Sequence, residues 1–134
     1  MHEKRVEIRW RDIDAFGHVN NAVYLTYFEE ARDEWMEKVI GPSGDVWGFV
    51  LARVAVDFRH ELNQSDDQVV VTVRLVKIGT SSITTQEQLA RQDGVVAAGA
   101  ESVMVSRDRD SGKARPLTGA ERAALEQELA ADAD

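Results

Sequence analysis

Apolar and charged residues alternate near the start of the chain. Val6, Ile8 and Trp10 are each separated by a charged residue, and this period of two is typical of a strand with one buried face. The pattern predicts a first strand over residues 3–11. It breaks over residues 12–21, where Asp, Gly and Asn favour turns, so a loop is expected there.

The period then lengthens to that of a helix, which we expect over residues 22–39. Either Asn20 or Asn21 can cap its first turn, because an Asn side chain accepts a hydrogen bond from a free backbone N–H group. Pro42 cannot continue the helical ladder, so the helix should end before it. An apolar stripe on one face predicts core residues, namely Tyr24, Tyr27, Phe28 and Trp35.

Four further strands and a short helix follow. The strands are expected at residues 48–58, 68–78, 81–91 and 95–107. The short joints between the last three predict an antiparallel meander. Thr118 and Glu121 have the spacing of a capping box ahead of a terminal helix that contains Leu125 and Leu129. Residues 130–134 are expected to fray.

This order of elements predicts an α+β fold in a single domain spanning residues 1–134. An antiparallel sheet of five strands needs one apolar face covered, and the long helix is the obvious cover. One helix cannot cover the whole sheet. The free edge and the remaining apolar surface of the sheet should therefore bind a second copy of the chain. We therefore expect a homodimer or a homotetramer.

Composition narrows the range of functions. The formal net charge is −8, and Lys and Arg form no run, which disfavours a nucleic-acid partner or an anionic membrane surface. The chain has no cysteine, so disulfides, thiolate nucleophiles and Cys-based zinc sites are excluded. No apolar run approaches the roughly 18 residues of a membrane span. These features predict a cytoplasmic protein.

The predicted loop carries a motif. The stretch WRDIDAFGHVNNAVY, from Trp10 to Tyr24, resembles the opening motif of the 4-hydroxybenzoyl-CoA thioesterase-like branch of hot-dog proteins. The resemblance extends over residues 3–107. It implies a five-stranded antiparallel sheet wrapped around a long central helix, with a short C-terminal helix added here. It also implies edge-to-edge dimers, with two active sites at the interface.

The implied activity is hydrolysis of an acyl thioester to a free acid and a thiol. Asp14 is the expected reacting carboxylate, either as a nucleophile or as a general base for water. The helix start at Asn20 and Asn21 is expected to stabilise the oxyanion, so Asn21 joins Asp14 as a candidate catalytic residue. His18 is expected to assist. Phe16 stands where similar plant acyl-carrier-protein thioesterases have an Asn, which argues against a full Asp-Asn-His mechanism.

Several residues are candidates for substrate binding through the resemblance. They are Gly17, Asn20, Tyr24, Arg59, Gly79, Thr80 and Ser81, the last three toward the pantetheine of a neighbouring subunit. Each also has a structural reading, as a turn, a cap, a core residue or a solvated charge. Asp12 is expected to be structural. No metal and no separate cofactor are expected, because coenzyme A is part of the substrate and the loop offers no ligand from another segment.

Two other functions stay open on the residues alone. One is hydration of an enoyl-CoA on the same fold, and the other is binding of an acyl thioester without turnover. The pattern also leaves open the acyl group and the choice between coenzyme A and acyl carrier protein.

Overall fold

The computed structural model describes residues 1–133 and shows one five-stranded antiparallel sheet with two helices. The elements, in chain order, are β1 (His2–Glu7), η1 (Trp10–Asp12), α1 (Asn21–Val39), η2 (Val46–Gly48), β2 (Phe49–Phe58), η3 (Gln64–Asp66), β3 (Gln68–Ile78), β4 (Ser82–Arg91), β5 (Val96–Ser106) and α2 (Gly119–Asp132). The strands lie in the order β1-β3-β4-β5-β2. This is the predicted α+β arrangement.

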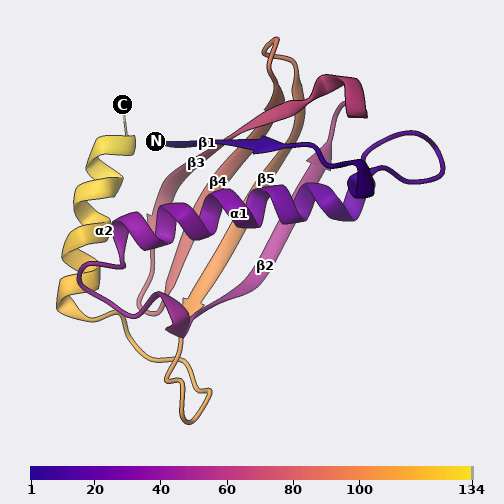
Figure 1. Ribbon diagram of the computed structural model, residues 1–134. Coiled ribbons are helices and arrows are strands. Elements are labelled where there is room, and N and C mark those ends of the chain that lie inside the picture. The colour runs from indigo at the N-terminus through magenta and orange to yellow at the C-terminus, as the bar shows by residue number, and fades with distance from the viewer. Residues whose placement is uncertain (134) are drawn as a thin grey trace.

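The long helix α1 crosses one face of the sheet, and α2 packs against β3 (Figure 1). The apolar stripe of α1 is buried as predicted, with Tyr27 and Trp35 fully covered. Alternate residues of β3 such as Val71 and Val73 point into the same core. The principal contacts of α1 with the sheet are to β1, β3 and β4. As a result β2, at the outer edge, is the least covered strand.

The first strand is shorter than its pattern predicts. It ends at Glu7, and Trp10 lies in the 3-10 turn η1 with 84% of its surface exposed. The Asp12 carboxylate accepts a hydrogen bond from the Arg9 N–H, and the Asp12 N–H donates to the Arg9 carbonyl. These bonds bend the chain before Trp10 reaches the sheet. The expected burial of Trp10 is therefore wrong, although Val6 and Ile8 are buried as predicted.

The remaining strands each begin and end within one residue of the predicted bounds. The capping box before α2 is also confirmed, because Thr118 and Glu121 each accept the other's backbone N–H. The fraying expected from residue 130 is contradicted as far as Asp132. Its buried carboxylate accepts from the Leu75 N–H at 2.9 Å and contacts the α-amino group of Met1. Residue 134, which was also expected to fray, lies outside the described residues.

None of the helices in residues 1–133 combines the length and apolarity that a bilayer crossing requires.

Candidate active site

The loop between η1 and α1 is closed by its own backbone. The Asp14 N–H donates to the His18 carbonyl at 2.9 Å, and the Gly17 N–H donates to the Asp14 carbonyl at 3.0 Å. Gly17 has a φ of +83°, a left-handed conformation that residues with a Cβ rarely adopt. Gly17 therefore shapes the turn that holds Asp14 in front of the helix.

The Asp14 carboxylate is held at both oxygens. Oδ1 accepts a hydrogen bond from the Phe16 N–H at 2.9 Å, and Oδ2 accepts from the Asn20 side-chain amide at 3.3 Å. The side chain is half-buried. Each carboxylate oxygen has a further lone pair, so these bonds fix the orientation of the group and leave it able to accept a proton.

Asn20, and not Asn21, is the N-cap of α1. Its Oδ1 accepts from the Ala22 N–H at 2.9 Å, while its own backbone N–H donates to the Asp12 carbonyl. Asn20 therefore has no free backbone donor, contrary to our expectation. The Asn21 N–H has no acceptor among residues 1–133. One free donor thus lies at the positive end of the helix dipole.

A buried brace ties this loop to α1. The Tyr27 hydroxyl donates to Asp12 Oδ2 at 2.6 Å. Burial, and then the hydrogen bond to Asp12, raise the pKa of Tyr27 well above its ordinary value, so its phenol stays protonated and keeps donating. Asp12 is structural, as predicted, because it joins the loop to the second turn of the helix.

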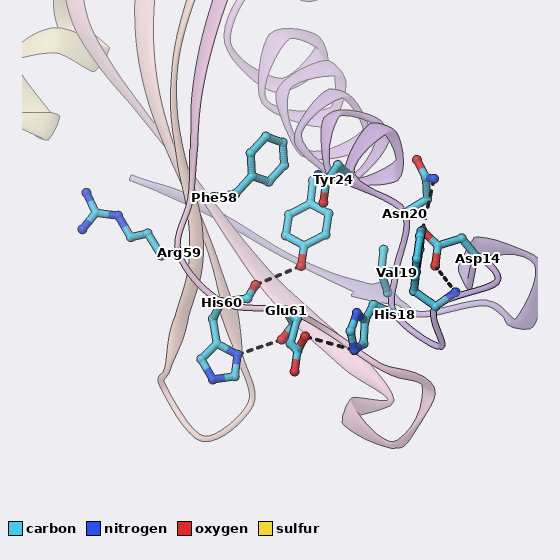
Figure 2. A pocket seen from close by; sticks show the side chains of 11 residues that line it. Asp14, His18, Val19, Asn20, Tyr24, Phe58, Arg59, His60 and Glu61 are labelled. Carbon is cyan, nitrogen blue, oxygen red and sulfur yellow. Dashed lines mark hydrogen bonds and ion pairs between the residues drawn. The ribbon is translucent and has the colours of Figure 1, made fainter.

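The segment after β2 forms the other wall. The Val19 N–H donates to the Leu62 carbonyl at 2.7 Å, which joins the two loops. His18 Nε2 lies 3.0 Å from Glu61 Oε2, and the Tyr24 hydroxyl donates to the His60 carbonyl at 2.9 Å (Figure 2). Burial raises the pKa of Tyr24, so it too remains a donor.

A cavity of about 580 Å³ opens between these two segments. Its lining residues are Asp14, Phe16, His18, Val19, Asn20, Asn21, Tyr24, Phe58, Arg59, His60 and Glu61. This volume lies within the range of roughly 300–1,000 Å³ found for small-molecule sites. Because Asp14 and the helix start border the same space, a bound ligand can touch both.

Most of the predicted site residues meet at this cavity. Gly17 shapes the loop without lining the cavity, and the Arg59 side chain points away from Asp14 (Figure 2). The turn at Gly79–Ser81 lies at the opposite end of the sheet, because Ile78 and Ile83 pair at one end of β3 and β4 whereas Val69 and Arg91 pair at the other. Within one chain the turn cannot reach the Asp14 cavity.

The sequence reasoning missed Phe58 and Glu61 as cavity residues. Phe58 packs edge-on against Tyr24, with ring centroids 5.3 Å apart. The available signal was a polar run of Arg59, His60 and Glu61 directly after a strand, because loop residues at strand ends often carry function. These residues face the loop that contains Asp14 and His18, which is distant in sequence. The contact between the two segments could therefore not be predicted without the fold.

The described part of the chain forms no cluster of metal ligands. Among residues 1–133, no group of three or more His, Asp and Glu side chains is placed to hold a metal ion.

Comparison with known proteins places this geometry in a family. The model of the thioesterase-like superfamily matches residues 8–131. The long-chain acyl-CoA thioesterase FadM of Escherichia coli is 30% identical over 132 residues, covering 93% of this chain and 97% of that protein. An Arabidopsis thaliana chloroplast acyl-acyl carrier protein thioesterase, ATL3, is 32% identical over 88 residues, covering 61% of this chain and 44% of that protein.

The fold has solved counterparts. A Thermus thermophilus thioesterase, crystallised with coenzyme A and zinc, is 34% identical with a TM-score of 0.85, and the match covers 96% of this chain and 94% of that one. The hot-dog fold expected from the loop motif is therefore confirmed. With a family model that matches nearly the whole chain, this protein belongs to the thioesterase-like superfamily.

Proposed function

We propose that this protein hydrolyses acyl-CoA thioesters at the Asp14 cavity. The observation that carries the proposal is the arrangement at the start of α1, where a fixed carboxylate and the unpaired Asn21 N–H border one cavity. Membership of the thioesterase-like superfamily supports the reaction. The relatives named as an acyl-CoA thioesterase and solved with coenzyme A support the substrate.

Hydrolysis needs one group that handles a proton or attacks carbon. In the general-base route, Asp14 takes a proton from water while the water oxygen adds to the thioester carbonyl. The tetrahedral intermediate then collapses, the C–S bond breaks, and the thiolate leaves and takes up a proton. In the covalent route, an Asp14 oxygen attacks the thioester carbonyl carbon, the C–S bond breaks and the thiolate leaves and takes up a proton. Water then hydrolyses the resulting anhydride, which releases the acid and restores Asp14. The two hydrogen bonds to Asp14 orient the carboxylate for either route.

The oxyanion needs a donor, and the Asn21 N–H meets that need in the proposal. It lies in the first turn of α1, where the helix dipole favours negative charge. Removing one oxyanion donor from other hydrolases costs about 2.7–4 kcal/mol in activation free energy. A single helix N–H can therefore contribute a factor of about 10²–10³ to the rate.

His18 assists in this scheme and does not replace Asp14. Its Nε2 is engaged with Glu61, which fixes the ring at the cavity wall. From this position the ring contacts and orients the substrate, and it carries a proton during the reaction. Phe16 supplies no hydrogen-bonding side chain, so the scheme contains no Asp-Asn-His triad.

The assembly in the proposal is a homodimer formed through β2, with tetramers built from it. The edge strand β2 leaves Leu51 42% and Phe58 46% exposed. Antiparallel pairing of β2 with its copy sets the Phe49 end of one chain beside the Phe58 end of the other. The Gly79–Ser81 turn belongs to the Phe49 end, so dimerisation brings it toward the partner's cavity. This supports the predicted pantetheine contact.

The proposal separates from its rivals by the products formed from crotonyl-CoA and saturated acyl-CoAs. A thioesterase releases free thiol from a panel of short, long, branched and aromatic acyl-CoAs, and the preferred chain identifies the acyl group. Loss of the enoyl absorbance of crotonyl-CoA without thiol release would instead indicate a hydratase. Binding of every substrate without either change would indicate a non-catalytic acyl-thioester-binding protein.

The carrier and the cellular location belong to the same proposal. Coenzyme A is favoured over acyl carrier protein because the acyl-CoA thioesterase and the coenzyme A complex are matched over nearly their full length, whereas the acyl-acyl carrier protein thioesterase is matched over 44% of its length. A cytoplasmic location, expected from the absence of cysteine, stays a prediction.

A further inference from the structure

The turn Gly79–Ser81, between β3 and β4, is held in place by the segment that follows β5. Each of its carbonyls accepts a hydrogen bond from that segment. In chain order, the donors are Arg122 Nη2 at 2.8 Å, the Leu117 N–H at 2.9 Å and the Ser106 N–H at 2.8 Å. The shape of this turn therefore depends on residues that lie far along the chain, and not only on the strands that it joins.

These bonds also set the direction of the N–H groups in the turn. The C=O and N–H of one planar trans peptide unit point in opposite directions. Because the Gly79 carbonyl faces Arg122 on α2, the Thr80 N–H, which belongs to the same peptide unit, faces away from α2. The N–H groups of Thr80 and Ser81 have no acceptor among residues 1–133. The turn thus presents free backbone donors on its outer side.

The start of α2 is a firm base for the contact from Arg122. Thr118 and Glu121 form a capping box, and the Arg122 N–H donates to the Thr118 carbonyl at 2.9 Å. Leu117, directly before the cap, is buried and supplies the neighbouring bond to the turn. The segment 117–122 therefore fixes successive peptide units of the turn.

The guanidinium of Arg122 is engaged differently from others in the chain. Arg9, Arg91 and Arg115 pair with carboxylates. Arg122 is half-buried and donates to the neutral carbonyl of Gly79, and no carboxylate among residues 1–133 pairs with it. A charged donor makes a stronger hydrogen bond than a neutral one. Arg122 therefore holds the turn with a strong bond for which no acidic side chain competes.

We propose that Arg122 is a positioning residue for the hydrolysis: by holding the Gly79 carbonyl, it orients the Thr80 N–H toward the pantetheine arm of a thioester in the partner's cavity. The amide carbonyls of pantetheine are suitable acceptors for a backbone N–H group. Arg122 itself touches no substrate atom in this scheme. The inference rests on the proposed function, because the β2-paired dimer brings the turn to the partner's cavity.

Two substrates with the same acyl group test this role. Acyl-CoA carries the phosphates and the pantetheine arm, whereas acyl-pantetheine carries the arm without the nucleotide. In Arg122→Met we expect KM to rise by about three- to tenfold for both substrates, which is the worth of about one hydrogen bond. The parental kcat should remain, because the pantetheine contact is made alike in the ground state and the transition state.

The split between KM and kcat separates positioning from a purely structural role. A variant that folds only in part lowers the measured kcat, since fewer molecules are active, and leaves KM unchanged. Arg122→Lys should restore the parental KM, because the contact uses one N–H, which an ammonium group can supply. The matched control is Arg5→Met, which removes the same charge from an exposed position on β1, at the opposite edge of the sheet from β2. It should match the parent with both substrates.

Three results would overturn the inference. A rise in KM confined to acyl-CoA would mean that Arg122 binds a phosphate directly. A fall in kcat with the parental KM would mean that Arg122 only stabilises the fold, and parental values of both would mean that the turn needs no tether. Each of these results leaves hydrolysis by the parent in place. A parent that released thiol from neither substrate would refute the proposed function itself, so the two failures are distinguishable.

Discussion

Asn20 links the helix cap to Asp14, the proposed reacting carboxylate. Its Oδ1 accepts the Ala22 N–H in the first turn of α1, and its amide nitrogen donates to Asp14. One side chain therefore sets both the start of the helix and the direction of the carboxylate. At the scale of single residues, the site depends on this shared contact as much as on Asp14.

Replacing Asn20 by Asp separates these two roles. Asp is as good an N-cap as Asn, so the thermal midpoint should change little. The new carboxylate faces Asp14, and a like charge raises the pKa of a neighbouring carboxyl. The acid limb of the kcat/KM profile should therefore move to higher pH, as measured by thiol release across the acid range.

The matched control for this change is Asn63→Asp, because Asn63 caps η3 in the same manner and lies outside the cavity. Its acid limb should coincide with that of the parent. An unmoved acid limb in Asn20→Asp would show that the contact with Asp14 has no bearing on the reaction.

At the scale of elements, local signals determine what a sequence can predict. The strands β2 to β5 lie between turn residues, β3 and β4 alternate regularly, and α1 and α2 have Asn and Thr caps, so their bounds followed from neighbouring residues. The alternation through Trp10 misled because the hydrogen bonds between Arg9 and Asp12 bend the chain there, and the Tyr27 hydroxyl holds the buried Asp12 carboxylate in place. No local pattern encodes a contact between residues so far apart along the chain.

The same limit applies to the candidate site. Asp14, His18 and the capping Asn lie in one motif, so the sequence predicted them together. Glu61 reaches His18 only because β2 returns the chain to the start of α1. The unpaired buried Nε of Arg32 is likewise a property of the packed core, since it depends on which oxygen atoms lie within reach.

The helix α2 is anchored by a buried carboxylate. Glu121 is fully buried and accepts two hydrogen bonds from Arg115, at 2.8 and 3.0 Å, and one from the Thr118 N–H. Burial alone would raise the pKa of Glu121, but the bonds from Arg115 and Thr118 outweigh it and hold the pKa below its ordinary value. The folded state therefore favours the charged form.

This depressed pKa predicts a pH-dependent stability. The contribution of Glu121 is fully present above its unfolded pKa of about 4.3 and is lost as the pH falls through the lower folded value. Glu121→Gln should lower the free energy of unfolding at neutral pH by about 1.5–3 kcal/mol. The difference from the parent should shrink in acid, as followed by denaturant unfolding at a series of pH values.

The exposed Glu126 of the same helix provides the control, and Glu126→Gln should leave stability within about 0.5 kcal/mol of the parent at every pH. A Glu121→Gln deficit that stayed constant into acid would contradict the role given to the charge.

At the scale of the whole molecule, the proposed dimer depends on the edge strand β2. The helix α1 contacts mainly β1, β3 and β4, so the apolar residues of β2 are the least covered. Leu51→Lys should shift sedimentation at micromolar concentration from dimer to monomer, because it places a charge in the interface. It should also reduce thiol release, since the partner completes each cavity in the proposed dimer.

Val95→Lys is the control, because Val95 is 37% exposed and lies in the turn between β4 and β5. It should sediment like the parent. A parent protein that is monomeric at these concentrations would refute both the dimer and the shared cavities.

The central claim is that Asp14 performs the chemistry of acyl-CoA hydrolysis, and Asp14→Asn tests it most directly. Asn can still accept the Phe16 N–H, so the loop should keep its form and the thermal midpoint should stay close to that of the parent. With the best substrate of the acyl-CoA panel, we expect kcat to fall by about 10²–10⁴-fold while KM changes little. A folded Asp14→Asn variant that released thiol at the parental rate would contradict the account.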